Sequence, residues 1–369
     1  MRCAFVLLAD QLGGHELMSL KLAEQFRSAG HESVVYYPNN LRNPQRLVDE
    51  SSNINTQAYD AGISPDKPQG LFSFITRSFR SFMLIWQLKS NYDLVINCQG
   101  SFEQNWVLSL FCRILKVNMA SYIPYTCYPS ERKAKFSVIR DRLYACLVSF
   151  PSKYIVIHEH YKKHLTDEFN IKDSLILVVN NQVDIEIDPI QDNLYLKPKP
   201  IEFLLPGRIY FPQKGQDILI QAIKQISDLN LNAKFRFVGD GPDIDKLKNE
   251  IISNKLSEVC FISPWQSDVS NLYKTCDCVV LPSRYEGVSL VMLEAISIQK
   301  PLIASTLPIN FSFINDNFLF ETENALSLSN QLLQMYQLIE SGNWQPKNNY
   351  FKLPVYEQKE VTLKINTWI

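Results

Sequence analysis

Two glutamates in the last third of the chain stand where carboxylates can bind a polyhydroxylated ligand. Glu286 and Glu294 are separated by seven residues around the start of an expected helix over 289–298. Glu286, in the loop before the helix, can accept hydrogen bonds from sugar hydroxyls, and Glu294, two turns later, can accept from a ribose. Amides at the helix entrance can hold phosphate oxygens; they belong to Gly287, Val288, Ser289 and Leu290. The plain alternative is a helix-terminal acid followed by a solvated glutamate.

Two cations occupy the equivalent place after an earlier strand. Arg208 and Lys214 lie between a strand expected at 201–205 and a helix expected at 215–227. A guanidinium binds phosphate oxygens as a bidentate fork and an ammonium binds them as a point charge, so together they can neutralise a diphosphate. Taken singly, each is also an ordinary solvated loop cation.

A glycine pair lies at the first strand-to-helix turn. Gly13, Gly14 and His15 separate a strand expected at 3–9 from a helix expected at 17–29. Glycines there let a bound group approach the backbone, and the helix N-terminus behind them attracts negative charge. The G-x-G-x-x-G spacing is absent, which disfavours a dinucleotide site, and an ordinary tight turn explains the glycines equally well.

The sequence contains no strong pattern of metal-binding residues. Asp243 and Asp245 form a D-x-D pattern, but they open a helix expected at 243–252, where acidic residues suit the helix dipole. Cys276 and Cys278 lack a second pair, and most of the eight cysteines lie in apolar runs. We therefore expect small buried thiols in a reducing compartment, and neither a metal nor another cofactor.

The elements that position these residues alternate between strands and helices. Strands are expected at 3–9, 33–37, 93–97, 119–123, 153–158, 175–179, 201–205, 234–238, 259–262, 277–281, 301–304 and 317–320. Helices are expected at 17–29, 71–89, 104–115, 159–168, 215–227, 243–252, 268–275, 289–298 and 323–340. This alternation predicts an α/β protein with two doubly wound domains, whose ligands would bind at the carboxyl ends of the strands, in an interdomain cleft.

The domain boundary is expected in residues 185–200, which lack periodicity and contain three prolines. A first domain over 1–190 and a second over 200–344 follow from this boundary. The terminal segment 345–369 has helical potential near its end and is expected to return to the first domain. A length of 369 residues suits two domains.

Composition and charge exclude several classes of protein. A net charge of −1 argues against a nucleic-acid-binding protein, and 12% aromatic residues argue against a disordered chain. The first apolar run is too short for a signal peptide and no run is long enough to span a bilayer, so a cytoplasmic protein is expected. Residues 67–142 nevertheless carry seven more basic than acidic side chains. This partly aromatic segment suits an anionic lipid surface, or else consists of core helices with solvated basic faces.

The motifs in their order resemble the retaining GT4 family of glycosyltransferases, glycosyl transferases group 1, which has the GT-B fold of two Rossmann-like domains. The resemblance is strong over about 200–305 and looser in the first half. The matching positions are Gly207-Arg208, Lys214-Gly215, Gly239 to Pro242, Pro282-Ser283, Glu286-Gly287 and Leu293 to Ala295, with Gly13 to Glu16 and Asn180 to Asp184 in the first half.

The resemblance implies a role for each motif. Arg208 and Lys214 would bind the diphosphate of a nucleotide sugar, Glu286 would contact the donor sugar, and the three would carry the catalysis. Glu294 would bind the ribose, while Gly13 and Gly14 would border the phosphates from the first domain. Family members transfer the sugar with retention and usually without a metal, since cations and helix-terminal amides stabilise the leaving diphosphate.

The sequence departs from the family pattern in its first half. Many members have a histidine after the strand that matches 119–123, where this chain has Tyr125 and Thr126. These two, together with His15 and His158, are candidates to contact the acceptor, although a lone histidine is more often structural. The usual E-G-F-G also reads Glu286-Gly287-Val288-Ser289 here.

These features together predict a hexosyltransferase that uses a UDP- or GDP-sugar and a glycan or polyprenyl-linked acceptor. The expected setting is bacterial surface-polysaccharide assembly, of O-antigen, capsule or lipopolysaccharide, on the cytosolic face of the inner membrane. One alternative is a nucleotide-sugar 2-epimerase of the same fold. Another is a non-catalytic nucleotide-sugar-binding protein, which the missing histidine would suit.

Overall fold

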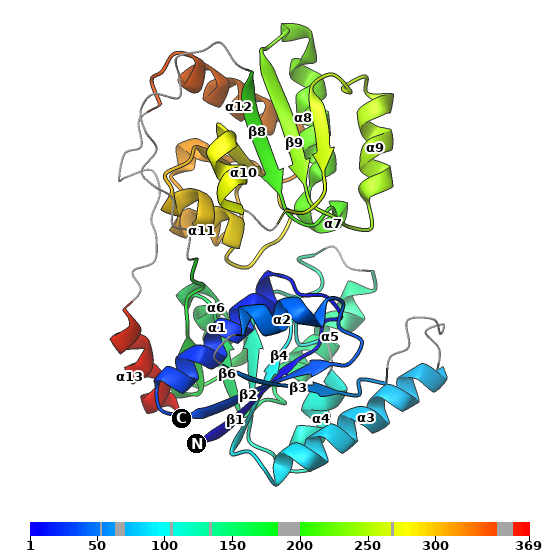
Figure 1. Ribbon diagram of the computed structural model, residues 1–369, viewed down its shortest axis with the longest axis vertical. Coiled ribbons are helices and arrows are strands. Elements are labelled where there is room, and N and C mark those ends of the chain that lie inside the picture. Colours follow the sequence, from blue (N-terminus) through cyan, green and yellow to red (C-terminus); the bar gives the residue numbers. More distant parts are fainter. Residues whose placement is uncertain are drawn as a thin grey trace. The chain divides into compact units, whose positions relative to one another are not determined.

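The computed structural model describes residues 1–51, 54–62, 71–103, 106–132, 135–183, 200–266, 269–344 and 357–369; for 71–73, 269 and 270 it describes the backbone alone. The chain divides into two compact units, Met1–Asn181 with Val355–Ile369, and Gln182–Pro354 (Figure 1). Several expectations fall outside the described residues: the linker as far as residue 199, Asp184, Lys67, Lys133 and the segment 345–356.

The first unit is built on a parallel sheet of seven strands in the order β3-β2-β1-β4-β5-β6-β7. The strands are β1 (Arg2–Leu7), β2 (Glu32–Pro38), β3 (Asn55–Tyr59), β4 (Leu94–Cys98), β5 (Met119–Ile123), β6 (Lys153–Val156) and β7 (Ile176–Val178). The helices are α1 (Gly14–Ser28), α2 (Pro44–Glu50), α3 (Leu71–Lys89), α4 (Trp106–Ile114), α5 (Ser137–Val148), α6 (Glu159–Phe169) and α13 (Gln358–Trp368). Because β1 pairs with both β2 and β4, the loop after β1 lies where the strand order reverses.

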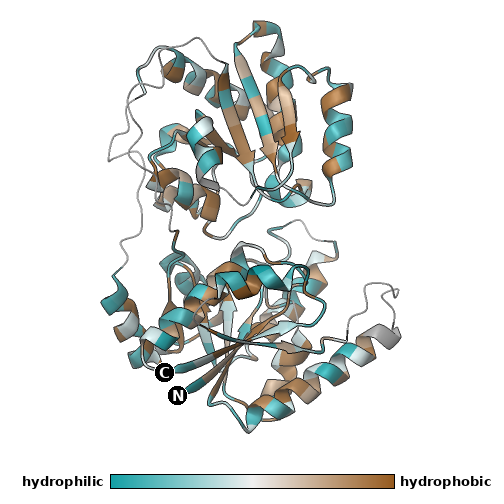
Figure 2. Cartoon of the chain, viewed as in Figure 1, coloured by the Kyte–Doolittle hydropathy of each residue, from teal (hydrophilic) through white to brown (hydrophobic). Residues whose placement is uncertain are grey.

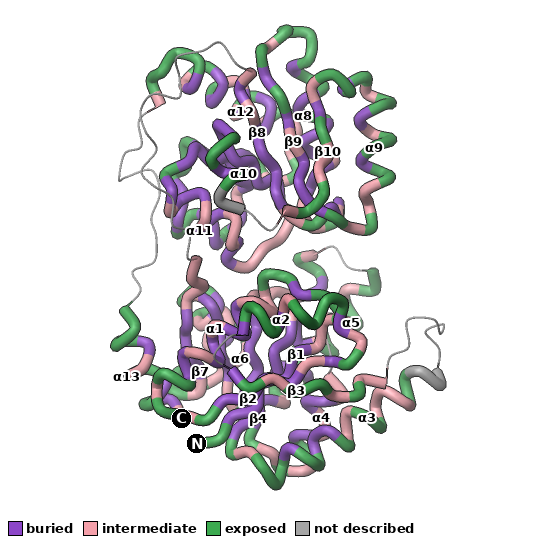
Figure 3. Tube along the Cα trace, in the orientation of Figure 1, coloured by how far each residue is buried: buried purple, intermediate pink, exposed green. Residues whose placement is uncertain are grey.

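Both faces of this sheet are covered by helices, which explains why its strands are apolar at consecutive positions. Ala4 and Val6 of β1 share a core with Ile85 of α3. Phe5, on the other face, meets Phe26 of α1 edge to face, with ring centroids 5.4 Å apart. Figure 3 accordingly shows the central strands buried, whereas the edge strand β3 is largely exposed. Helix α13 packs against α1 and β7, so the end of the chain belongs to this unit.

The second unit contains a parallel sheet of six strands in the order β10-β9-β8-β11-β12-β13. The strands are β8 (Ile201–Pro206), β9 (Ala233–Val238), β10 (Cys260–Ser263), β11 (Cys278–Leu281), β12 (Leu302–Ser305) and β13 (Leu319–Phe320). The helices are α7 (Phe211–Lys214), α8 (Gln216–Ile226), α9 (Ile244–Ser253), α10 (Val269–Thr275), α11 (Leu290–Ser297) and α12 (Ala325–Glu340).

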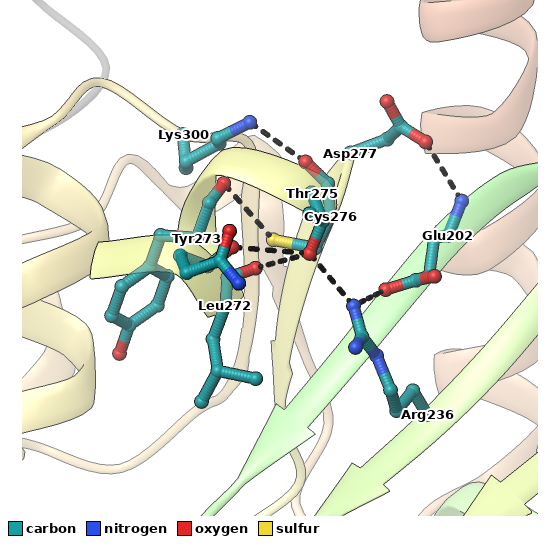
Figure 4. Close-up of polar contacts among 9 residues, drawn as sticks. Glu202, Arg236, Leu272, Tyr273, Thr275, Cys276, Asp277 and Lys300 are labelled. Carbon is teal, nitrogen blue, oxygen red and sulfur yellow. Dashed lines mark hydrogen bonds and ion pairs between the residues drawn. The ribbon is translucent and has the colours of Figure 1, made fainter. Parts of the chain in front are cut away.

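A polar network ties the elements of this second unit together near the start of β11. Figure 4 shows Arg236 of β9 between Glu202 of β8, with which it forms an ion pair, and Thr275, whose hydroxyl accepts a hydrogen bond of 2.8 Å. The carboxylate of Asp277 accepts from the amide of Glu202 at 2.8 Å. Buried Lys300 donates to the carbonyl of Cys276 at 2.7 Å. Because β8 and β11 begin here, the network fixes the sheet from the edge opposite the strands' carboxyl ends.

The expected alternation of strands and helices is confirmed, with bounds that mostly differ by one to three residues. The helix at 71–89 and the strand at 119–123 have the bounds expected from the sequence. Four elements were missed: α2, β3, α5 and α7. All eight cysteines are free, and six of them are buried; Cys127 is partly exposed and Cys146 is exposed. In the described part of the chain, no helix is long and apolar enough to cross a membrane.

Candidate active site

The second unit gathers the expected donor-binding residues at one edge of its sheet. Because all six strands are parallel, the loops that follow β8 and β11 leave the same edge, and these two strands are direct neighbours. The first loop leads through Arg208 into Lys214, and the second contains Glu286. Residues 72 positions apart in the sequence are thereby brought together.

Lys214 and Glu286 form an ion pair at this edge. The ammonium of Lys214 contacts Oε1 of Glu286, and the hydroxyl of Ser283 donates to the same oxygen at 3.0 Å. The Lys214 and Glu286 side chains are only 18% and 12% exposed. Charges removed from water to this degree are costly unless they are paired. The pair therefore holds a cation and a carboxylate side by side at the carboxyl edge of the sheet.

Two close backbone approaches hold these loops in place. Gly215, after α7, has φ +65°, and a Cβ atom there would lie 2.0 Å from the carbonyl oxygen of Pro282. Gly239, after β9, has φ +148°, and its Cβ would lie 2.0 Å from the carbonyl oxygen of Gly207. Only glycine fits such positions without displacing the backbone. The loops after β8, β9 and β11 are thus packed on one another.

Arg284 braces the loop that carries Glu286. Its guanidinium binds both carboxylate oxygens of Asp217 at 2.9 and 2.7 Å and Glu323 at 3.0 Å. Its amide donates to the carbonyl of Gln213 at 2.7 Å. A bidentate guanidinium pair fixes orientation as well as distance. Arg284 therefore connects the loop after β11 to α7, α8 and the start of α12.

Glu294 lies on α11, as expected, and its carboxylate has a tyrosine partner. The hydroxyl of Tyr273, on α10, donates to Oε2 of Glu294 at 2.6 Å. Tyr273 is fully buried, and burial together with the Glu294 carboxylate raises the pKa of its hydroxyl. This contact fixes one carboxylate oxygen at the inner side of the helix.

The other expected donor-binding residues lie in the same two loops and at the start of α11. Arg208 is exposed, with its guanidinium 5.7 Å from the ring centroid of Tyr210. Ser289 is the N-cap of α11 without a side-chain cap, and Leu290 begins the helix. Gly287 is partly exposed and Val288 is buried in the turn before it.

Both aspartates of the D-x-D pattern lie at the start of α9, as expected, with Asp243 as its N-cap and Asp245 in its first turn. Asp243 accepts a hydrogen bond of 2.8 Å from the amide of Phe211, and Asp245 pairs with Lys248 at 3.0 Å. Within the described residues, no group of three His, Cys, Asp or Glu side chains is arranged to hold a metal ion.

In the first unit, the glycine turn leads directly into α1. The carboxylate of Glu16 accepts a hydrogen bond of 2.9 Å from the amide of Gly13, so it already occupies one donor of this helix terminus. Gly13 and Gly14 are exposed. His15 follows, with its ring 5.0 Å from that of Tyr122, and both ring nitrogens are shielded and have no hydrogen-bond partner among the described residues. Burial lowers the pKa of His15 to about 4.

The buried imidazole of His15 makes stability depend on pH. Because an unfolded chain protonates histidine near pH 6.5 while folded His15 does so near pH 4, the unfolded state takes up the proton first as the pH falls. The free energy of unfolding should drop by about 2 kcal/mol between pH 7 and pH 5 through this group. Urea unfolding of the unaltered protein and of His15→Phe at both pH values measures the difference. Equal pH dependence in the two proteins would contradict it.

The remaining candidates in the first unit have partners within that unit. The hydroxyl of Thr126 is 2.9 Å from Nδ1 of His164, and Arg132 donates to the hydroxyl of Tyr125 at 3.4 Å. His158 caps α6, with Nδ1 accepting from the amide of His160 at 3.1 Å. His158 and Thr126 therefore have visible structural roles, whereas His15 does not.

Several residues at the candidate site were missed by sequence reasoning. Arg284, Asp217 and Tyr273 were given no role, and Ser283 was matched to the family motif without an expected contact to Glu286. Ser283 and Arg284 stand beside Glu286 in the motif, so their position was a usable signal. Tyr273 and Asp217 are recognised only through the fold, because they lie 21 and 67 positions from their partners.

The sequence and the fold are similar to those of known proteins. Residues 187–345 match the family described as glycosyl transferases group 1. A UDP-Gal:alpha-D-GlcNAc-diphosphoundecaprenol alpha-1,3-galactosyltransferase of Escherichia coli is 31% identical over 222 residues, covering 56% of this chain and 57% of that protein. An uncharacterized glycosyltransferase of Methanocaldococcus jannaschii is 29% identical over 214 residues, 57% of each chain. The alignments thus span just over half the length of these relatives.

A solved structure extends the similarity to the whole chain. Anabaena HepE, in complex with UDP and glucose, matches with a TM-score of 0.71 at 19% identity, over 100% of this chain and 94% of that chain. Residues 187–345 of this chain match the glycosyl transferases group 1 family, and the chain as a whole has the GT-B fold. The resemblance to glycosyl transferases group 1 is thereby confirmed for residues 187–345, and the expected fold class is confirmed.

Proposed function

We propose that this chain is a retaining hexosyltransferase of the GT4 type in bacterial surface-polysaccharide assembly. It transfers a sugar from a UDP- or GDP-sugar to a glycan or lipid-linked acceptor, in the cytoplasm at the inner membrane. The observation that carries the proposal is the Lys214–Glu286 pair beside Arg208 and the start of α11. The names of the relatives support transfer over the two alternatives, because they are glycosyltransferases, one of which uses a diphosphate-linked lipid.

The ion pair suggests how the site responds to a donor. Without a ligand, Glu286 neutralises Lys214. A donor diphosphate would take over the ammonium, together with Arg208, and would free the Glu286 carboxylate to accept hydrogen bonds from sugar hydroxyls. Glu294, held at one oxygen by Tyr273, would accept from the ribose. The amides at the entrance to α11 would add further donors to the phosphates.

In the sugar-transfer step, the main task of the protein is to stabilise the departing diphosphate, and a protein side chain that accepts a proton is less important. A bond forms between the acceptor oxygen and the anomeric carbon, the bond from that carbon to the phosphate oxygen breaks, and its electron pair leaves with the diphosphate. The proton of the acceptor hydroxyl passes to the oxygen of the departing diphosphate. The cationic side chains of Lys214 and Arg208 are well suited to stabilise the negative charge that grows on the diphosphate. We propose that these cations do so without a metal ion. The carboxylate of Glu286 holds the sugar in the reactive orientation.

Product analysis tests this function against its alternatives. The protein is incubated with UDP-galactose, alone and with a GlcNAc-diphospholipid, and then with GDP- and ADP-sugars, and the products are identified by mass spectrometry. Release of the nucleoside diphosphate together with a glycosylated acceptor supports the proposal. An altered nucleotide sugar formed without acceptor would identify an epimerase instead. Intact donors in every mixture would identify a non-catalytic binding protein.

A further inference from the structure

The outer side of helix α5 is apolar although it faces solvent. Phe136, which precedes the helix, is 80% exposed, and Val138, Ile139 and Leu143 are 69%, 70% and 49% exposed. The inner side is apolar as well, with Tyr144, Leu147 and Val148 buried. A surface helix normally carries only one apolar face. The second face of α5 is therefore not explained by the packing of this unit.

The backbone of Phe136 is also not explained by the packing of this unit. Its φ is +56°, in the left-handed region, and it caps α5 without any side-chain cap. A non-glycine residue pays about 1–2 kcal/mol for this conformation. Here that cost accompanies a large ring in water, a combination more readily explained by a binding surface than by the fold.

A second helix on the same layer has the same property. Ile75, Phe79 and Trp86 of α3 are 56%, 58% and 58% exposed, while Ile85 and Leu88 on its inner side are buried. Figure 2 shows hydrophobic residues along α3, and Figure 3 shows that several of its turns are exposed. The outer side of α3 therefore carries large apolar side chains as well as basic ones.

Helix α4 connects these two helices into one layer. Phe82 of α3 meets Phe111 of α4 with ring centroids 5.4 Å apart. At the other side of α4, Arg113 donates to the carbonyl of Ser149, directly after α5, at 2.6 Å. The exposed apolar residues of α3 and α5 therefore belong to helices that flank α4 on one face of the sheet.

The charges beside these residues favour an anionic surface. Lys135 and Arg142 are exposed beside Phe136 and Ile139. Of the acidic groups nearby, Glu103 binds Arg132 and Arg140 and Asp141 accepts from the amide of Ser130, while Glu131 is exposed. Apolar side chains flanked by exposed cations, for which the described residues provide no ion-pair partner, match the boundary between acyl chains and anionic headgroups.

We propose that α3 and α5, with Phe136 at the start of α5, dock this chain on the surface of an anionic lipid bilayer. The inference rests on the proposed function in one respect, because it names the membrane as the source of a lipid-linked acceptor. Arg140 on α5 binds Glu103 in the loop after β4, at 2.8 Å. Helix α5 thus begins at the same sheet edge as His15 and Tyr125, where an acceptor from the bilayer would enter.

Vesicle co-sedimentation tests this docking surface. The unaltered protein, Phe136→Ser/Ile139→Ser and Ile75→Ser/Phe79→Ser are mixed with phosphatidylglycerol or phosphatidylcholine vesicles. The matched control, Leu229→Ser/Ile252→Ser, removes two residues that are 56% and 67% exposed in the second unit. Binding to phosphatidylglycerol should fall by about tenfold or more in each test pair and stay unchanged in the control. Binding should also weaken with salt and be weaker on phosphatidylcholine.

The outcomes separate docking from the chemistry. Thermal unfolding shows that each variant is folded, and transfer to a soluble acceptor should be retained in both test pairs. Equal vesicle binding by test and control pairs, or no binding by the unaltered protein, would overturn the docking surface. Self-association that the test pairs abolish, without vesicle binding, would identify a second copy as the occupant and would also overturn it. If the unaltered protein binds the vesicles but transfers no sugar, the result would instead count against the proposed function.

Discussion

Replacing Glu286 with glutamine should lower the rate of sugar transfer by about 100-fold or more while leaving the fold unchanged. Glutamine keeps the shape of the side chain and its contact with Ser283, but it removes the charge that pairs with Lys214. Lys214→Ala should cause a loss of similar size, because the leaving diphosphate loses its point charge. Initial rates at saturating donor and acceptor measure both effects.

A carboxylate away from the site provides the control for this experiment. Glu258 lies in the same unit and is exposed, so Glu258→Gln removes an equal charge without touching the loops after β8 and β11. Its transfer rate should stay within about twofold of the unaltered rate. Near-normal transfer by Glu286→Gln and Lys214→Ala would exclude both residues from the active site.

Substitution of Gly215 by alanine should be among the most destabilising single changes in the second unit. The new Cβ would meet the Pro282 carbonyl oxygen at 2.0 Å, in a backbone with φ +65°. Left-handed strain and the clash together should cost about 3 kcal/mol or more and lower the Tm by about 6 °C or more. Because Pro282 precedes Ser283, the shift should also reduce donor binding. Calorimetry and donor titration measure the two effects.

Substitution of Gly342 provides a control that separates the steric clash from the backbone strain. Gly342 has φ +67°, but no atom lies within 4 Å of a Cβ built there. Gly342→Ala should therefore cost only about 1 kcal/mol, from the left-handed conformation alone. Equal destabilisation by the two substitutions would show that the contact between the loops after α7 and β11 does not exist as described.

The order of strands and helices could be predicted because buried parallel strands are apolar without interruption, as in β4 and β11. Strand β3 was missed because it is an edge strand of sequence NTQAY, with little buried surface. Helix α5 was missed because apolar residues on two faces hide the helical period. Helix α7, with four residues, is too short to show any period.

The members of the candidate site could be predicted, but their contacts could not. The motif order identified Lys214 and Glu286, which stand between a strand and the following long helix, and Glu294, which lies on α11 itself. The pairing of Lys214 with Glu286 depends on β8 and β11 being neighbours, which is a property of the sheet order. Tyr273 was hidden for the same reason, because α10 meets α11 only in the folded unit.

Isothermal titration of UDP and of a UDP-sugar tests the central claim most directly. If Lys214 holds the diphosphate and Glu286 holds the sugar, Lys214→Ala should weaken both ligands by about tenfold or more. Glu286→Gln should weaken the UDP-sugar alone and leave UDP binding equal or tighter, because it releases Lys214 from its ion pair. Unchanged affinities in Lys214→Ala, or an equal loss of both ligands in Glu286→Gln, would contradict the account.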